Sequence, residues 1–462
     1  MPKLKIKIED LFNIPSAVIY NPDEYQSTAY ATIDSRNVKK GAIFFALKGK
    51  NFDGHKFVKD ALEKGAGAIV INENRLDEYD FVKGTIVTVK DTTKSYGDLA
   101  KIVRLKSKYL VVSLTGSAGK TTTKEMIATL LSERFAVSKT EANNNNHIGV
   151  PLSIFFAEPK TDILILEHGT NHFGEIEYSA NIAMPDYALI TNIGEAHIQY
   201  LKNKESVYEE KAKLFEAAQS KGGKIFVNSD DPVIRKGAAK FKSKTTFGFK
   251  GKPDVKGEII DYDSSGFPKI KIANGKRNVE VKLPLLGEAS AKNFLAAVSV
   301  AFEFGLTKKE IISGAKKLKS VAGRLDYEIA GKSMIINDAY NSSPESVKAA
   351  LETLKKNKKL KRKIILLGDM LELGRKAPEL HAELASYFKG LKSSEILLIG
   401  KNMLRLSEKL KDKKFNVKHF RRRDSLKKYL EGINLTETAV LVKGSRGMKM
   451  EEFLRTIKET AA

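Results

Sequence analysis

The feature that most constrains this chain is a loop of small residues that joins an apolar stretch to a helix-like stretch. The loop reads Thr-Gly-Ser-Ala-Gly-Lys-Thr-Thr over residues 115–122. Gly116 and Gly119 let the backbone curl, so that its N–H groups and the start of the next helix favour a bound anion. Lys120 would reach the terminal phosphates of a nucleotide, and Thr121 would offer its hydroxyl to Mg²⁺. The segment predicts a phosphate-binding loop for ATP; the alternative is an ordinary glycine turn before a helix.

The loop indicates a nucleotide and leaves the reaction open among a ligase, a kinase and a mechanical NTPase. It departs from the general pattern at one position, because Leu114 stands where the first glycine is usual. The apolar strand before it and the amphipathic helix after it favour phosphate binding over a plain turn. The loop residues that we expect to contact ATP are Thr115, Gly116, Ser117, Ala118, Gly119, Lys120, Thr121 and Thr122.

Length and composition bound the class of protein. A chain of 462 residues is too long for one ordinary core, and the length suggests about three domains. With 42% hydrophobic and 29% charged residues, the composition is globular. No stretch approaches the roughly 20 apolar residues of a membrane span, and residues 1–7 lack the apolar core of a secretory signal. We therefore expect a cytoplasmic protein without membrane insertion. The absence of cysteine excludes disulfides, thiolate metal sites and a cysteine nucleophile.

The formal charge of +24 allows two interpretations. One is a nucleic-acid partner, and the other is a solvated lysine-rich surface that attracts anionic small molecules. The densest basic run, residues 355–363, has no interleaved aromatic residues that could stack on bases. It lies just before an apolar run, as a polar connection would. We therefore expect no nucleic-acid partner.

Hydrophobic patterning divides the chain into three parts that alternate strand-like and helix-like segments. We expect an N-terminal domain of residues 1–107, a central domain of residues 108–321 and a C-terminal domain of residues 322–462. Residues 247–285 differ, because they form short β-like pieces with turn signals. The predicted fold class is α/β, with a small N-terminal α/β domain, a central P-loop ATPase-like parallel sheet with extra β-strands, and a C-terminal Rossmann-like domain. The main strands are expected at residues 43–47, 68–71, 85–89, 109–114, 163–167, 187–191, 224–228, 334–337, 364–367, 396–399 and 439–442.

Polar residues near the ends of the central strands are candidates for a metal site. Glu167 ends a predicted strand, and the carboxyl end of a parallel strand faces the ligand crevice. Its carboxylate suits Mg²⁺, which prefers oxygen ligands; the alternative is a solvated glutamate. His197 follows the next predicted strand, although a lone histidine is more often a surface residue. Lys211 lies in a predicted helix among many lysines, so spacing alone indicates a solvated side chain.

Longer motifs are distributed along nearly the whole chain. They are Phe-Phe-Ala-Leu-Lys-Gly at residues 44–49, Thr-Asn-Ile-Gly-Glu-Ala-His at 191–197, Asp-Ala-Tyr-Asn-Ser-Ser-Pro at 338–344 and Gly-Asp-Met-Leu-Glu-Leu-Gly at 368–374, with His381 after the last. Together with the phosphate loop they resemble the motifs of the Mur ligases, the ATP-dependent enzymes that assemble the peptide of the peptidoglycan precursor. The loop of that family also lacks the first glycine.

The resemblance implies ligands for ATP and Mg²⁺. Glu167 and His197 would bind Mg²⁺ together with Thr121. Lys211 falls where the family has a carbamylated lysine, an adduct that converts an ammonium into a carboxylate able to help hold a metal. The residue two positions later is usually acidic and is Lys213 here, and Ala289-Ser290 replaces the family's His-Asn pair. The implied catalytic residues are Lys120, Lys211 and His197, and the implied ATP contacts outside the loop are Asn293, Arg324 and Asp338.

The resemblance also implies the substrates. The N-terminal part would hold the UDP end of UDP-MurNAc-tripeptide, and the C-terminal part would hold D-alanyl-D-alanine. Ser445 and Arg446 would bind the carboxylate of the dipeptide, because arginine matches a carboxylate in a bidentate geometry; the alternative is a capped helix start. The implied substrate contacts are Asp34, Ser35, Arg36, Phe45, Lys48, Gly49, Asp53, His55, Asn143, Asn145, Asn146, Asn171, Tyr340, Asn341, Ser445 and Arg446.

The implied reaction is the formation of an amide bond through an acyl phosphate. ATP would phosphorylate the terminal carboxylate of the tripeptide, and the amine of D-alanyl-D-alanine would then attack it. We expect a monomer that uses ATP and Mg²⁺. Alternatives are a sister Mur ligase with another acceptor, a folylpolyglutamate synthetase-like ligase and, from another class, a basic nucleic-acid-dependent ATPase.

Overall fold

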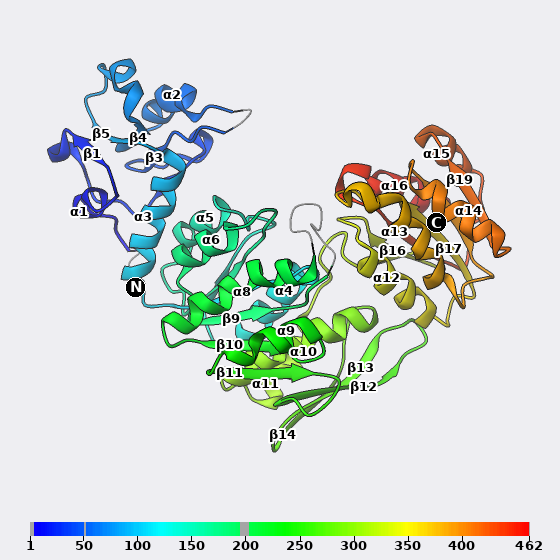
Figure 1. Ribbon diagram of the computed structural model, residues 1–462. Coiled ribbons are helices and arrows are strands. Elements are labelled where there is room, and N and C mark those ends of the chain that lie inside the picture. Colours follow the sequence, from blue (N-terminus) through cyan, green and yellow to red (C-terminus); the bar gives the residue numbers. More distant parts are fainter. Residues whose placement is uncertain (1–3, 50–51, 195–202, 462) are drawn as a thin grey trace. The chain divides into compact units, whose positions relative to one another are not determined.

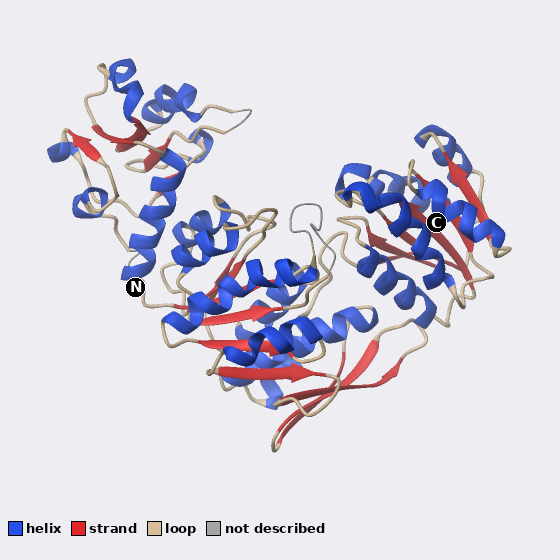
Figure 2. Ribbon diagram, in the orientation of Figure 1, coloured by secondary structure: helices blue, strands red, loops and turns tan. Residues whose placement is uncertain are grey.

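The computed structural model describes residues 4–49, 52–194 and 203–461. Its strands form three sheets of five, nine and six strands, each with helices beside it (Figure 2). The α/β class is therefore confirmed. Contacts divide the chain into two compact units, one of residues 1–115, 135–189 and 212–225 and the other of residues 116–134, 190–211 and 226–462.

The first sheet is small and mostly parallel. Its order is β1-β5-β4-β3-β2, and only β1 runs antiparallel to its neighbour. The three strands expected in this part are confirmed as β3, β4 and β5. The hydrophobic pattern does not reveal the outer strands, because β1 is largely exposed and β2 has only two residues. The bounds are β1 Val18–Tyr20, β2 Ala31–Thr32, β3 Ile43–Phe45, β4 Ala68–Asn72 and β5 Thr85–Val89, with α1 Ile8–Phe12 and α2 Val58–Glu63 beside them.

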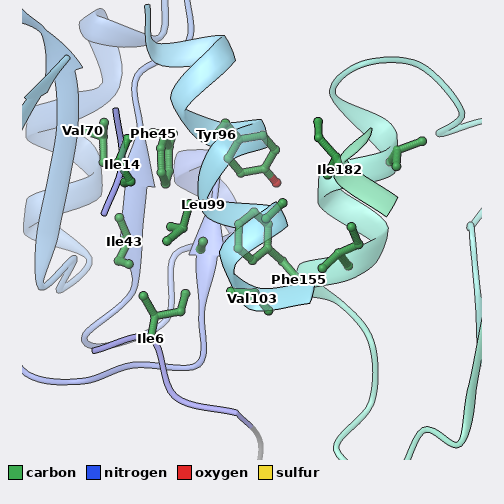
Figure 3. Packing of buried hydrophobic residues seen from close by; sticks show 14 of the residues in the cluster. Ile6, Ile14, Ile43, Phe45, Val70, Tyr96, Leu99, Val103, Phe155 and Ile182 are labelled. Atoms are coloured by element: carbon green, nitrogen blue, oxygen red, sulfur yellow. The ribbon is translucent and has the colours of Figure 1, made fainter. Parts of the chain in front are cut away.

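Helix α3 (Thr92–Lys106) joins the core of the first sheet to helices of the second sheet (Figure 3). The buried ring of Tyr96 packs against Phe45 of β3 and Phe155 of α5, with ring centroids 5.1 and 5.0 Å apart. Burying a large side chain of this kind stabilises the fold by about 1.5–3 kcal/mol. One hydrophobic core therefore spans both groups of elements. The partner helices are α5 Gly149–Phe155 and α6 Glu175–Ala183.

The second sheet has nine strands in the order β14-β13-β12-β11-β10-β9-β6-β8-β7. Strands β6 and β7 both pair in parallel with β8, while β12, β13 and β14 form an antiparallel ribbon. The four expected central strands are confirmed as β6, β8, β9 and β10, and the ribbon accounts for the expected extra strands. The bounds are β6 Leu110–Thr115, β7 Val137–Lys139, β8 Ile163–Glu167, β9 Tyr187–Ile190, β10 Lys224–Asn228, β11 Lys244–Gly248, β12 Val255–Tyr262, β13 Pro268–Asn274 and β14 Arg277–Lys282. The helices are α4 Lys120–Leu131, α8 Lys204–Ser220, α9 Pro232–Gly237, α10 Gly287–Glu303 and α11 Lys308–Lys317.

The third sheet has the order β15-β16-β20-β17-β18-β19, and only β15 is antiparallel. Helices cover both of its faces (Figure 1), because α12 and α14 share one hydrophobic core with its strands while α15 and α16 share the other. This is the expected doubly wound pattern. The bounds are β15 Asp326–Ala330, β16 Ser333–Asp338, β17 Arg362–Gly368, β18 Glu395–Ile399, β19 Asn416–Phe420 and β20 Thr438–Lys443, with α12 Pro344–Lys356, α13 Ala377–Glu383, α14 Met403–Asp412, α15 Arg423–Glu431 and α16 Phe453–Ala461.

Within residues 4–49, 52–194 and 203–461, no helix combines the length and the hydropathy that a membrane span requires.

Gly97 of α3 provides a test of the shared core. A Cβ atom at this position would lie 2.3 Å from Tyr178 Oη and 2.8 Å from Ile182 Cδ1 of α6. Replacing glycine by alanine inside a helix ordinarily stabilises the helix by roughly 0.8–1 kcal/mol. Here we expect Gly97→Ala to lower the free energy of unfolding by about 1–3 kcal/mol, measured by urea denaturation, because the packed side chains of Tyr178 and Ile182 must shift.

The control is Gly432→Ala, since the nearest atoms to a Cβ there lie 3.9 Å away. This variant should remain within about 0.5 kcal/mol of the parent protein. A Gly97→Ala protein that is as stable as the parent would contradict the described packing of α3 on α6.

Candidate active site

The phosphate loop lies between the end of β6 and the start of α4, as predicted. Gly116 has φ +152° and Gly119 has φ +77°, which are values that favour glycine. A Cβ at Gly116 would lie 1.9 Å from Thr191 Oγ1, and a Cβ at Gly119 would lie 2.5 Å from Asn293 Oδ1. Both glycines are therefore required by the backbone conformation and by space. The second contact places the side chain of Asn293, an expected ATP contact, beside the loop.

Residues that follow β9 fix the shape of the loop. The N–H of Ala118 donates to Asn192 Oδ1 at 3.0 Å, and the N–H of Ser117 donates to the Asn192 carbonyl at 3.0 Å. Thr191 Oγ1 donates to the Ala118 carbonyl at 2.6 Å. Sequence reasoning does not assign Thr191 and Asn192 to the site, although they begin one of the quoted motifs. The available signal is a pair of polar residues directly after a buried strand.

Two side chains at the start of α4 are positioned for phosphate and metal chemistry. Lys120 Nζ donates to the Gly116 carbonyl at 2.9 Å, so the ammonium group lies against the loop. Thr121 is buried, with 5% of its surface exposed. Its hydroxyl is an oxygen donor of the kind that Mg²⁺ prefers. The roles of Lys120 toward phosphate and of Thr121 toward Mg²⁺ remain predictions.

Glu167 lies at the end of β8 where the phosphate loop begins on β6, because Leu114 and Glu167 are paired in register. Its side chain is buried, and Oε1 accepts a hydrogen bond from Asn145 Nδ2 at 2.8 Å. Asn145 therefore orients the carboxylate. Asn146 has another role, since its Oδ1 accepts the N–H groups of Ile148 and Gly149 at the start of α5.

The remaining residues of this segment act mainly through the backbone. The carbonyl of Asn143 accepts the N–H of Asn145 at 2.8 Å, and the N–H of Asn171 donates to Glu175 Oε2 at 2.7 Å. These bonds shape the two turns that flank Glu167. These bonds involve only backbone groups of Asn143 and Asn171. The expected contacts of the two side chains with the substrate remain predictions.

Lys211 of α8 is buried, with 2% of its surface exposed. Burial, reinforced by the charge of Lys120 and opposed by Glu210, lowers the pKa of Lys211 from its ordinary value to about 7. The expectation from spacing alone, that the side chain of Lys211 is solvated, is therefore wrong. His197 lies outside the described residues. Among the residues that the structure does describe, no group of three or more histidine or carboxylate side chains is arranged around a common metal position.

In the first sheet, His55 and Asp53 form one hydrogen-bonded cluster. The N–H of Asn72 donates to His55 Nε2 at 3.1 Å, so the Nδ1–H of His55 donates to Asp53 Oδ1 at 2.8 Å. Arg75 Nη1 also donates to Asp53, at 2.7 Å. Burial alone would raise the pKa of Asp53, but the hydrogen bonds from His55 and Arg75 outweigh it and lower the pKa to about 2. Both ring nitrogens of His55 are thus occupied within the protein.

The other residues assigned to the UDP end differ in accessibility. Phe45 is fully buried against Tyr96, so its ring belongs to the core and not to a ligand surface. Arg36 is exposed and donates through Nη2 to Asp34 at 2.7 Å. Ser35 is buried. Lys48 and Gly49 form backbone contacts. Lys48 forms an isolated β-bridge with Asp53, and the N–H of Gly49 donates to the Phe52 carbonyl at 2.7 Å.

A buried ion pair organises the loops of the third sheet. Lys443 Nζ donates to Asp338 Oδ2 at 2.7 Å and to the Asn341 carbonyl at 2.9 Å. The other carboxylate oxygen of Asp338 accepts the N–H of Leu325 at 3.0 Å. Burial raises the pKa of Asp338, against the lowering effect of Lys443. Sequence reasoning does not assign Lys443 to the site; the signal is a lysine at the end of an otherwise apolar strand.

Ser445 and Arg446 follow β20 and differ in exposure. Ser445 is buried, and its Oγ accepts the N–H of Leu371 at 2.8 Å. Its side chain does not cap the short helical turn that follows, so the capped-helix alternative is not supported. The Arg446 side chain is 69% exposed and contacts Glu451 at 3.3 Å. Its guanidinium group, 5.6 Å from the ring centroid of Tyr340, is accessible to a ligand.

His381, which belongs to a quoted motif, is a buried structural residue. The N–H of Met370 donates to its Nε2 at 2.9 Å, so its Nδ1–H donates to the Ala377 carbonyl at 2.6 Å. Burial lowers the pKa of His381 below its ordinary value, against the opposing effects of Ala377 and Asp369. The neutral ring therefore fixes the turn after β17.

The fold and these loops define an α/β protein that binds a nucleotide at a phosphate loop. Comparison with known families gives the class more closely: residues 29–104 match the Mur ligase family, catalytic domain, residues 114–301 match the Mur ligase middle domain, and residues 323–446 match the Mur ligase, glutamate ligase domain.

The chain belongs to the Mur ligase family. It is 31% identical to the UDP-N-acetylmuramoyl-tripeptide–D-alanyl-D-alanine ligase of Bacillus subtilis over 99% of both chains. It is similar to a crystal structure of MurF from Acinetobacter baumannii, with a TM-score of 0.87 and 27% identity over 99% of this chain and 100% of that chain. It is also similar to the MurF ligase of Thermotoga maritima in complex with ADP, with a TM-score of 0.81 and 28% identity over 93% of this chain and 97% of that one.

The buried neutral His381 predicts a pH dependence of stability. Its pKa is below 6.5 in the folded protein and near 6.5 in the unfolded chain, so the unfolded state binds more protons as the pH falls below 6.5. The stability that depends on the neutral ring is present above pH 6.5 and is lost below it. We expect His381→Gln to be less stable than the parent protein at pH 8 by about 1–3 kcal/mol, with the difference shrinking as the pH falls.

Urea denaturation between pH 5 and pH 8 measures this difference. The exposed His147 provides the control, because His147→Gln should follow the parent protein across the range. A difference between His381→Gln and the parent that stays constant with pH would show that His381 is not held neutral by the fold.

Proposed function

We propose that this chain is an ADP-forming ligase that joins D-alanyl-D-alanine to UDP-MurNAc-tripeptide and produces UDP-MurNAc-pentapeptide. The observation that carries the proposal is the match to the UDP-N-acetylmuramoyl-tripeptide–D-alanyl-D-alanine ligase of Bacillus subtilis, which runs nearly end to end along both chains. The ADP complex of the Thermotoga maritima protein supports ATP as the activating substrate. We also propose three domains with boundaries near residues 107 and 321, a monomer, a cytoplasmic location and no nucleic-acid partner.

Activation is needed because a carboxylate does not react with an amine in water. An oxygen of the tripeptide carboxylate attacks the γ-phosphorus of ATP, and ADP leaves. The amine nitrogen of D-alanyl-D-alanine then attacks the acyl carbon to give a tetrahedral intermediate, from which phosphate leaves and a proton is lost. Both steps gather negative charge, so the protein must supply positive groups and N–H donors.

The phosphate loop supplies those groups in the proposed mechanism. Its curled backbone and the start of α4 present N–H groups, and Lys120 provides a positive charge for the β- and γ-phosphates. Thr121 and Glu167 offer hard oxygen donors, which fit Mg²⁺, and His197 would complete the set. Mg²⁺ held by these residues would supply positive charge that neutralises the phosphates. Asn293, Arg324 and Asp338 are the proposed further contacts to ATP.

Lys211 is proposed to act as a carbamate. A buried lysine with a pKa lowered to about 7 is half neutral at that pH, and a neutral amine can attack CO₂. The N–C bond forms, one proton is released, and the neutral amine becomes an anionic carbamate. The carbamate would attract the charge of Lys120, which the protonated form of Lys211 repels.

The proposed substrate contacts form three groups. Phe45 is left out because its ring is in the core, and His55 acts by holding Asp53. The UDP end would meet Asp34, Ser35, Arg36, Lys48, Gly49 and Asp53, and the peptide would meet Asn143, Asn145, Asn146 and Asn171. The acceptor would meet Asn341, Ser445 and Arg446, and the guanidinium group of Arg446 lies by the ring of Tyr340.

The test of the proposed function is the acceptor dependence of phosphate release. Release from ATP should require UDP-MurNAc-tripeptide and D-alanyl-D-alanine together, because neither half-reaction turns over alone. Phosphate release and the mass of the product measure this. Turnover with neither substrate would refute the ligase, a preference for a single amino acid would indicate a sister ligase, and stimulation by DNA or RNA would indicate the nucleic-acid-dependent ATPase.

The carbamate of Lys211 leads to a separate prediction. Lys211→Ala should lower the turnover by about 100-fold or more, because an anionic group near the phosphates is lost. Added acetate or formate should raise the turnover of the variant by about tenfold, since a small carboxylate can replace the carbamate. The matched control is Lys213→Ala on the same helix, whose side chain is 39% exposed and should be dispensable. Absence of rescue would count against the carbamate.

A further inference from the structure

Three loops of the third sheet bring Arg324, Tyr340 and Arg446 to the same edge. Strands β16 and β20 are parallel neighbours in which Asp338 pairs with Lys443, and Tyr340 and Arg446 follow these two ends. Arg324 precedes β15, which runs antiparallel to β16, so the start of β15 lies at the end of β16. The edge therefore collects residues that are far apart in the sequence.

The ring of Tyr340 contacts both guanidinium groups. The Cζ atom of Arg324 lies over the ring at 4.0 Å from its centroid, and that of Arg446 lies over it at 5.6 Å. A cation within about 6 Å of an aromatic centroid is attracted by the negative charge of the ring face. One aromatic ring thus attracts two guanidinium groups that come from different loops.

The backbone fixes the ring relative to Arg324. The N–H of Tyr340 donates to the Gly323 carbonyl at 3.0 Å, and the N–H of Leu325 donates to Asp338 Oδ1 at 3.0 Å. Gly323 has φ +72°, and a Cβ there would lie 3.1 Å from the nitrogen of Tyr340. The residue before Arg324 is therefore a glycine for a physical reason, because only glycine lets the two segments approach this closely.

The same cluster reaches the loop of Arg446. Lys443 binds both Asp338 and the carbonyl of Asn341, so it connects the segments on either side of Tyr340 to the end of β20. Arg446 begins a short helical turn three residues later. The position of the ring is thus set by hydrogen bonds from both neighbouring loops, and not by its own side-chain torsions alone.

We propose that Tyr340 is a positioning residue whose ring holds Arg324 for the phosphates of ATP and Arg446 for the carboxylate of the acceptor, and thereby links the binding of the two substrates. The roles of the two arginines rest on the proposed function. The ring face, and not the phenolic hydroxyl, carries the effect. Tyr340→Phe should therefore preserve what Tyr340→Leu removes.

The experiment compares the Michaelis constants of these two variants for all three substrates. Tyr340→Leu should raise KM for ATP and KM for D-alanyl-D-alanine by about threefold to thirtyfold each, the range that follows from losing a cation–π contact. KM for UDP-MurNAc-tripeptide should change by less than about twofold, and Tyr340→Phe should stay within about twofold throughout. The matched control is Tyr429→Leu, which removes a ring that lies 4.1 Å from Lys418 Nζ in the same sheet but outside the site.

Three outcomes would overturn the proposal. They are unchanged constants in Tyr340→Leu, a rise for only one of the two substrates, and an equal loss in Tyr340→Phe. A double-mutant cycle adds a stricter criterion, because the effects of Tyr340→Leu and Arg324→Gln should be less than multiplicative. Arg405 provides the comparison, because its side chain is exposed and pairs with Glu408 outside the site. The effects of Arg405→Gln and Tyr340→Leu on the Michaelis constants should be multiplicative.

The failure of the proposed function would be recognised separately. If the parent protein does not use D-alanyl-D-alanine, the ligase assignment is wrong. The effect of the contact between Arg324 and Tyr340 on nucleotide binding is then tested by equilibrium titration with a nonhydrolysable ATP analogue, which needs no turnover. Weaker binding in Tyr340→Leu and parental binding in Tyr340→Phe would support the role of the ring, and equal binding in all three proteins would overturn it.

Discussion

The hydrogen bonds between Asn192 and the phosphate loop are the interaction on which the nucleotide site depends. A backbone that curls toward an anion cannot pair its N–H groups with a neighbouring strand, so other groups must satisfy them. Asn192 accepts from Ser117 and Ala118, and the glycines at 116 and 119 allow the curl. The shape of the loop is therefore set before the nucleotide binds, which is the condition for electrostatic catalysis without reorganisation.

Buried charge has a similar organising role in the third sheet. The pair of Lys443 and Asp338 costs desolvation energy that its attraction offsets only in part, and removing one partner of such a pair costs about 3–5 kcal/mol. The pair is hydrogen-bonded to the Asn341 carbonyl and to the Leu325 N–H as well. A hydrophobic replacement would fill the same space but would not connect three loops. The pair is thus better explained by the arrangement of the site than by stability.

The sequence predicts local features well and long-range partners poorly. The phosphate loop is determined by adjacent residues, and the buried parallel strands are continuous apolar runs, so both are recovered. Strands β15 and β19 are edge strands with exposed and charged residues, which hides them. The family resemblance implies site roles for Phe45, His55 and Lys211, but the burial of each depends on elements distant in the chain. Their roles in the core, in a hydrogen-bonded cluster and as a low-pKa lysine therefore required the fold.

In the third sheet, the exposure of a polar side chain depends on how far its residue lies beyond the end of a strand. Asp338 and Lys443 are the last residues of β16 and β20; their side chains are 13% and 1% exposed and bind each other. Arg446, three residues beyond, is 69% exposed. On β20 the polar residue at the strand end is thus enclosed by its neighbours, whereas the residue three positions later emerges from the sheet. A change at Lys443 consequently acts on the shape of the loops, and a change at Arg446 acts on an exposed side chain that a ligand can reach.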